Sequence, residues 1–96
     1  MFTIKEPGFS PKLSIEPKFA TITEGGTLVI QCNVTGKPAP SILWSKPYGW
    51  LSHNHVVSGN ELKILQASAD DGGTYVCSGQ NKLGVQSQRS VISVES

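Results

Sequence analysis

The sequence predicts an all-β fold in which two antiparallel sheets pack face to face as a sandwich. Cys32, Trp44 and Cys77 follow one another in the order expected where a disulfide joins two stacked sheets and an indole packs against it. Tyr75 lies two residues before Cys77, from where a tyrosine hydroxyl can hydrogen-bond back to the backbone at the corner before a strand. The 10 glycines and 6 prolines are scattered along the chain, as is typical of short strands joined by turns.

The individual strands follow from the alternation of apolar and polar side chains, because successive residues of a strand point to opposite faces. The expected strands are residues 27–34, 41–46, 61–65, 73–80 and 85–94. Their inward side chains are Leu28, Ile30, Cys32, Val34, Ile42, Trp44, Leu62, Ile64, Tyr75, Cys77, Ile92 and Val94. Their outward side chains include Val29, Gln31, Asn33, Leu43, Ser45, Thr74, Val76, Ser78 and Gln80. A hairpin through residues 81–84 joins the last two strands, and we expect Gly84 to supply its positive φ.

Five segments, in order, carry a resemblance to a known family: residues 24–32, 36–46, 60–64, 71–77 and 81–84. Together they are similar to an immunoglobulin domain of the intermediate (I-set) type, a two-sheet antiparallel Greek-key sandwich, and the resemblance covers residues 11–96. It implies a core marked by Trp44, Leu62, Asp71 and Tyr75. The family's split first strand fits residues 12–16 and 19–23, divided by Pro17, which has no N–H to donate to a ladder. The stretch between Trp44 and Val56 is too short for the two extra strands of a variable domain.

Length and composition agree with one domain, because 96 residues lie near the size of a single immunoglobulin sandwich. We expect residues 1–10, which contain Pro7 and Gly8, to be a linker to a preceding domain or an added N-terminus, and residues 11–96 to be the domain. No segment approaches the ~18 consecutive apolar residues of a membrane span. The first residues lack a basic start followed by an apolar run, so no signal peptide is predicted. The chain looks like one module of a longer protein.

The resemblance implies a disulfide between Cys32 and Cys77. Such a bridge closes a loop of about 46 residues and contributes roughly 4 kcal/mol in the chain-entropy account. The alternative is that both thiols stay reduced and act as small core hydrophobes, as in cytosolic muscle members of the family. The bridge is favoured, because both positions are filled and because Asn33-Val34-Thr35 is an N-glycosylation sequon on an outward position. A glycan on Asn33 would deny that sheet to partners, and the expected location is extracellular.

The sequence contains no constellation of residues that predicts catalysis or a cofactor. His53 and His55 are the only histidines, and zinc needs three or four converging ligands, so they are expected to be solvated beside a strand. His55 is nevertheless placed to pair with Asp70 or Asp71. No Gly-x-Ser-x-Gly turn is present. Residues 23–27 form a turn rather than a phosphate-binding loop, because no helix follows. The prediction is a protein that is not an enzyme and holds no metal.

The charge argues against polyanionic partners, and the absence of a long apolar run argues against direct insertion into a membrane. Eight basic residues oppose seven acidic ones, giving a net charge of +1, and the basic residues are spread along the chain. A nucleic-acid or heparin-binding stripe needs several of them on one face.

The segment after the strand at 41–46 is unusually aromatic, since it contains Tyr48 and Trp50 before Leu51. Leu51 is expected to pack on the core. Trp50 either folds back over the sandwich edge or belongs to an interface, where Tyr and Trp are enriched. The expected interface combines the loop with outward aliphatic side chains and a polar rim: Leu43, Tyr48, Trp50 and Val76, with Val85 as a possible addition and Lys46 and Gln80 at the rim.

The favoured function is a non-catalytic module of a multidomain extracellular matrix or cell-adhesion protein. Residues 42–46 and 94–96 are similar to repeats of matrix proteoglycans of the perlecan kind, and such domains also occur in matrix proteins related to the thrombospondin-motif metalloproteases. The alternative is an intracellular scaffold module of muscle or cytoskeleton, similar to titin or palladin domains. A third possibility is the ectodomain of a receptor kinase or phosphatase. The expected partners are other proteins and neighbouring domains, with weak self-association.

Overall fold

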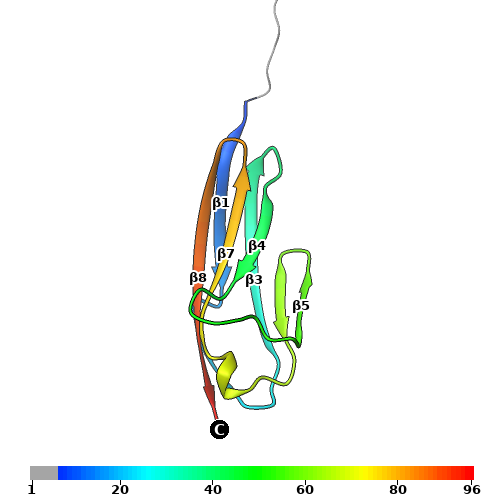
Figure 1. Ribbon diagram of the computed structural model, residues 1–96. Coiled ribbons are helices and arrows are strands. Elements are labelled where there is room, and N and C mark those ends of the chain that lie inside the picture. The colour runs from blue at the N-terminus through cyan, green and yellow to red at the C-terminus, as the bar shows by residue number, and fades with distance from the viewer. Residues whose placement is uncertain (1–6) are drawn as a thin grey trace, which may run out of the picture.

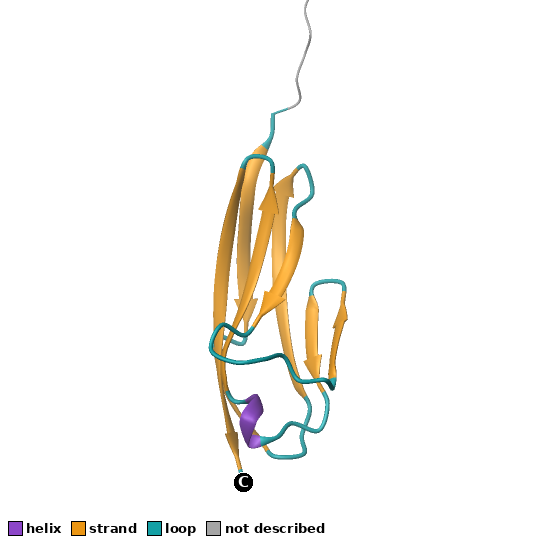
Figure 2. Cartoon of the chain, in the orientation of Figure 1, coloured by secondary structure: helices purple, strands orange, loops and turns teal. Residues whose placement is uncertain are grey.

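The computed structural model describes residues 7–96, and the predicted two-sheet sandwich is present in it (Figure 1). The strands are β1 (Phe9–Glu16), β2 (Phe19–Thr23), β3 (Leu28–Lys37), β4 (Ser41–Ser45), β5 (His55–Ser58), β6 (Glu61–Ile64), β7 (Gly73–Asn81) and β8 (Gly84–Glu95). One sheet has the order β1-β3-β6-β5 and the other β2-β8-β7-β4. Every pairing is antiparallel except that of β2 with β8. Figure 2 shows the short 3-10 helix η1 (Ala69–Asp71) before β7, at the end of the sandwich where the C-terminus lies.

The first strand is longer than the sequence predicted. β1 begins at Phe9 because Phe9 pairs with Lys37 of β3, and this pairing also carries β3 beyond the predicted end at residue 34. The predicted linker 1–10 is therefore wrong for Phe9 and Ser10, which belong to the sandwich. Its first six residues lie outside the described part of the chain. β1 and β2 join different sheets, and Pro17 stands between them as predicted.

The hairpin between β7 and β8 differs from the prediction at Gly84. Positive φ occurs at Gly25, Gly59, Gly73 and Gln66 among the described residues, so Gly84 does not supply it. The Asn81 side chain fixes the turn instead, because its Oδ1 accepts the N–H of Leu83 at 2.9 Å. Glycine at position 84 allows close packing against β1, because a Cβ there would lie only 3.2 Å from Cβ of Ser10.

The core lies between the sheets and is centred on the predicted disulfide, which is present. Cys32 of β3 and Cys77 of β7 are fully buried and joined, with their Cα atoms 6.4 Å apart. Trp44 lies directly beside Cys77 in the β4–β7 register and is 6% exposed. Leu51 packs against this core from the loop after β4, as predicted. The remaining buried apolar residues are Leu13, Ile15, Leu28, Ile30, Leu62, Ile64, Ala67, Tyr75 and Ile92.

A hydrogen-bonded corner leads into β7. The hydroxyl of Tyr75 donates to the backbone carbonyl of Asp71 at 2.6 Å, inside the core. The carboxylate of Asp71 in turn accepts the N–H of Ser68 at 2.8 Å, which holds η1 in place. Burial raises the pKa of Tyr75 to about 12, with a smaller contribution from the nearby charge of Asp71. Gly73 opens β7 at φ +130°, a conformation that L side chains rarely adopt.

Reducing the disulfide is expected to lower the free energy of unfolding by about 4 kcal/mol, because the unfolded chain then regains the freedom of a long loop. The measurement is urea unfolding at neutral pH with and without a reductant. A Cys32→Ala, Cys77→Ala double variant serves as the control, since its midpoint does not depend on reductant. Equal midpoints for the oxidised and reduced protein would contradict the prediction.

Tyr75→Phe is expected to destabilise the fold by roughly 1–3 kcal/mol, because the buried carbonyl of Asp71 loses its donor. The folded pKa of about 12 lies above the ordinary value of 10.0, so the stability that Tyr75 contributes is complete below pH 10 and is lost as the pH rises through 12. Chemical unfolding between pH 7 and pH 11 measures both effects. An identical alkaline loss of stability in the variant would rule out Tyr75 as its source.

Candidate functional site

The outer surface of the sheet β2-β8-β7-β4, which we call the apolar face, carries exposed aliphatic and aromatic side chains among hydroxyls. Phe19 is 78% exposed, Leu43 68% and Val85 62%, while Val76 is half-buried and Val91 lies beside Phe19 in the register. The other outward side chains of this face are Ser41, Ser45, Thr74, Ser78, Gln80, Ser87 and Arg89, with Thr21, Thr23, Ser93 and Glu95 along the pairing of β2 with β8. The predicted outward positions Leu43 and Val76 therefore share one surface with Val85.

Arg89 lies in the middle of the apolar face. It stands beside Val76 in the β7–β8 register, and Val76 stands beside Ser45 of β4. It is the only arginine in the sequence, and no ion pair to it is found within residues 7–96. Together with Phe19 and Lys18 it lines a depression of about 300 Å³ at the β2 edge. An arginine with no ion pair among residues 7–96 is available to bind a carboxylate of another molecule.

The loop after β4 presents two aromatic rings to solvent. Tyr48 is 91% exposed and Trp50 is 89% exposed, whereas Leu51 is half-buried against the core. The alternative in which Trp50 folds back over the sandwich edge is therefore wrong. In Figure 1 this loop crosses the lower half of the sandwich from β4 to β5. It lines a depression of about 550 Å³ that also reaches Thr74 of the apolar face.

The predicted pairing of His55 with Asp70 or Asp71 is wrong. His55 begins β5, and its Nδ1 lies 2.5 Å from the backbone carbonyl of Ser52. Lys46 covers the corner instead, because its Nζ donates to the backbone carbonyl of Asp70 and lies 5.4 Å from the centre of the Tyr75 ring. Lys46 is thus occupied by the corner and is less available to a partner than a rim lysine would be.

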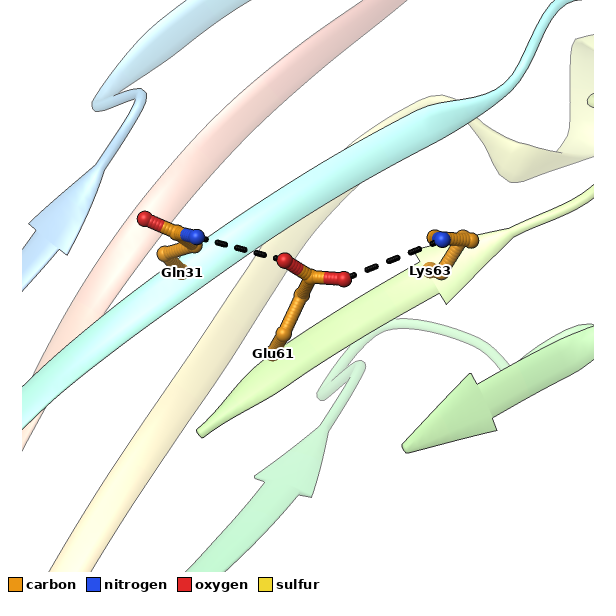
Figure 3. Close-up of polar contacts among 3 residues, drawn as sticks. All are labelled: Gln31, Glu61 and Lys63. Carbon is orange, nitrogen blue, oxygen red and sulfur yellow. Dashed lines mark hydrogen bonds and ion pairs between the residues drawn. The ribbon is translucent and has the colours of Figure 1, made fainter. Parts of the chain in front are cut away.

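The outer surface of the sheet β1-β3-β6-β5, which we call the polar face, carries a paired group of polar side chains. Figure 3 shows Glu61 between two partners. It accepts from Nε2 of Gln31 at 3.2 Å and pairs with Nζ of Lys63 at 3.9 Å. Asn33 is exposed on the same surface, with its Oδ1 3.5 Å from Nδ2 of Asn60. The polar face thus carries paired polar groups beside the exposed valines Val29 and Val56, whereas the apolar face carries larger apolar side chains and an arginine.

In the part of the chain that the structure describes, no three His, Cys, Asp or Glu side chains come together in a way that would hold a metal ion. Across residues 7–96 there is also no helix with the length and apolar character needed to cross a bilayer. The four core positions implied by the resemblance, Trp44, Leu62, Asp71 and Tyr75, are all buried.

Sequence reasoning missed Phe19, Arg89 and Val91 as members of the apolar face. The alternation in residues 19–23 was a usable signal, since Ala20 and Ile22 pack on the core and the odd positions must then point outward. The position of Phe19 beside Val91 depends on the parallel pairing of β2 with β8, which joins distant parts of the chain.

The comparisons with known proteins agree with this geometry. The model of the immunoglobulin domain family matches residues 10–81. The chain is 36% identical over 90 residues to the mouse basement membrane-specific heparan sulfate proteoglycan core protein, covering 94% of the chain and 2% of the relative. It is 37% identical over 94 residues to human cell adhesion molecule 2, covering 95% of the chain and 22% of the relative. A solved complex of titin M10 and the obscurin-like 1 immunoglobulin domain, in a mutant form, aligns with a TM-score of 0.77 at 26% identity, covering 92% of this chain and 95% of that one.

The two tryptophans are expected to differ in their access to a soluble quencher, because Trp50 is 89% exposed and Trp44 only 6%. Acrylamide quenching of the native protein should therefore fall several-fold in Trp50→Phe, whose emission should also move to shorter wavelength. The urea-unfolded variant provides the control, since Trp44 becomes accessible there. If Trp50→Phe kept the accessible, long-wavelength emission, the placement of Trp50 in solvent would be wrong.

Proposed function

The chain belongs to the immunoglobulin domain family, and from that premise we propose that it is a non-catalytic protein-binding module of a multidomain extracellular matrix or cell-adhesion protein. It binds its partner through the apolar face and the loop after β4. The observation that carries this proposal is the exposure of Leu43 on the apolar face and of Tyr48 and Trp50 in the loop that follows the same strand. Removing apolar side chains from water is favourable, so burying these residues against a partner stabilises the complex.

The composition of this surface fits a protein partner. Interface cores are enriched in aromatic residues and arginine and depleted in lysine and acidic residues. The apolar face has Phe19 and Arg89, and the adjoining loop has Tyr48 and Trp50. Small hydroxyl side chains separate the apolar ones, and they allow close approach and hydrogen bonding. Tyr48 and Trp50 are the candidates for hot spots, because a few anchoring aromatic residues carry most of the energy of an interface.

An extracellular location is supported by two independent lines. The buried disulfide requires an oxidising compartment to form and persist. The relatives that are at least 36% identical include a basement membrane proteoglycan core and a cell adhesion molecule. The chain corresponds to a small part of each relative, which supports a module repeated within a longer protein. β1 starts and β8 ends at opposite ends of the sandwich (Figure 1), a geometry that allows domains to be joined in a row.

A second candidate is an intracellular module of muscle or cytoskeleton. The observation that favours it is the alignment with a structure of a titin and obscurin-like 1 complex at 26% identity. In that setting the two cysteines would be reduced and would pack as small apolar side chains. The fold is the same in both settings, so the oxidation state of Cys32 and Cys77 separates them.

The first test is a thiol count on the full-length protein from its own cells, alkylated before and after reduction and read by mass spectrometry. Extracellular function is expected to leave Cys32 and Cys77 protected until a reductant is added. Two free thiols would favour the intracellular scaffold and overturn the proposal.

The second test concerns the binding surface. Trp50→Ala in the secreted full-length chain is expected to reduce retention in the matrix deposited by the producing cells about 30-fold, the equivalent of a 2 kcal/mol hot spot. Val56→Ala is the matched control, because Val56 is 48% exposed but belongs to the polar face. Equal retention of the wild type and both variants would remove the loop after β4 from the interface.

A further inference from the structure

We propose that Asn33 carries an N-linked glycan, and that this glycan covers the polar face and leaves the apolar face as the surface open to protein partners. The inference rests on the extracellular placement proposed above. It adds a modification site, and it fixes which side of the module can be approached.

The geometry of the sequon suits attachment. Asn33 and Thr35 lie on the same side of β3 and both are exposed, while Val34 between them packs against the core. On one side Asn33 faces the small side chain of Ser14 in β1. On the other side the pairing of β3 with β6 has already ended at Gln31. A bulky group on Asn33 therefore meets little that it would have to displace.

Asn33 has no structural task that explains its presence. Among the described residues its side chain makes one contact, the 3.5 Å approach of Asn60 to its Oδ1, which leaves Nδ2 without a partner. Nδ2 is the atom that would bear the sugar. The side-chain Nδ2 atoms of the other asparagines all have partners: that of Asn81 donates to the carbonyls of Phe9 and Pro38, that of Asn54 to the carbonyl of Leu65, and that of Asn60 to Oδ1 of Asn33. Of the four asparagines in the sequence, Asn33 alone has a Ser or Thr two residues later.

The chemistry is a transfer of an oligosaccharide from a lipid-linked pyrophosphate donor. The bond between the first sugar carbon and the donor's phosphate oxygen breaks, and a bond from that carbon to Nδ2 of Asn33 forms. The amide nitrogen loses one proton, and the lipid pyrophosphate leaves with the electrons of the broken bond. The transfer takes place in the secretory pathway, the same compartment in which the Cys32–Cys77 disulfide would form.

The surroundings of Asn33 are compatible with a hydrated glycan. The neighbouring outward side chains include Gln31, Glu61 and Lys63, whose polar groups are already paired with one another (Figure 3). Covering this group with sugar does not separate Glu61 from Lys63 or Gln31. The apolar face belongs to the opposite sheet, so a glycan on Asn33 does not lie over Leu43 or Arg89.

The decisive experiment treats the native full-length protein with peptide N-glycanase in ¹⁸O-water and identifies the peptide around residue 33 by mass spectrometry, together with the thiol count. Conversion of Asn33 to labelled Asp supports the proposal. Unmodified Asn33 with an oxidised Cys32–Cys77 pair overturns it and leaves the extracellular function standing. Unmodified Asn33 with two free thiols overturns both.

Variants of the secreted full-length chain test separately whether Asn33 is glycosylated and which face of the domain is open to partners. Thr35→Ala and Asn33→Gln are expected to abolish occupancy at residue 33, whereas Thr35→Ser keeps the sequon and its occupancy. Retention of Asn33→Gln in the deposited matrix is expected to stay within about twofold of wild type, in contrast to Trp50→Ala. If labelled Asp is found neither in the wild type nor in Thr35→Ser, Asn33 is not a glycosylation site. If Asn33→Gln loses as much matrix retention as Trp50→Ala, the glycan-bearing face takes part in binding and the proposal that only the apolar face is open to partners is overturned.

Discussion

The contact between the two sheets through Cys32, Cys77 and Trp44 is the constraint on which the rest of the structure depends. A sandwich of this size has one thin core, and its interior is filled almost entirely by alternate residues of β1, β3, β6, β7 and β8. The disulfide fixes the distance and register between β3 and β7. Trp44 then fills the space beside it, even though its buried Nε1 finds no hydrogen-bond partner among the described residues. Packing outweighs a lost hydrogen bond at this position, because the whole indole is removed from water.

Because alternate residues of each strand point into the core, the remaining residues form two outer surfaces. These two surfaces differ in composition. On one sheet, Glu61, Gln31 and Lys63 pair with one another. On the other, aliphatic and hydroxyl side chains surround a single arginine. The loop after β4 extends this second surface, because Leu51 occupies the core position and leaves Trp50 outside. The same period of two residues thus determines both which side chains fill the core and which side chains each outer surface presents.

Local patterns in the sequence were sufficient for most of the fold, and pairings between distant segments account for what they missed. The alternation in residues 27–34 and 73–80 predicted the buried side chains, since each depends only on its neighbours in the strand. The start of β1 at Phe9 depends on Lys37, and the place of Phe19 depends on Val91, so neither is visible in a short window. The conformation of Trp50 likewise depended on which of two nearby apolar residues would reach the core. Asn33, by contrast, was recognisable at once, because a sequon is defined by three consecutive residues.

The parallel pairing of β2 with β8 has a mechanical consequence. Residues Phe19 to Thr23 run in the same direction as Val91 to Glu95, and the chain enters and leaves at opposite ends of the sandwich (Figure 1). Tension between the two ends therefore pulls β2 and β8 past each other along their length. All the hydrogen bonds of this ladder are then loaded at the same moment, rather than opened one after another from an end. The strand pair therefore resists stretching as a unit, and the sheet that contains it keeps its order until the whole ladder gives way.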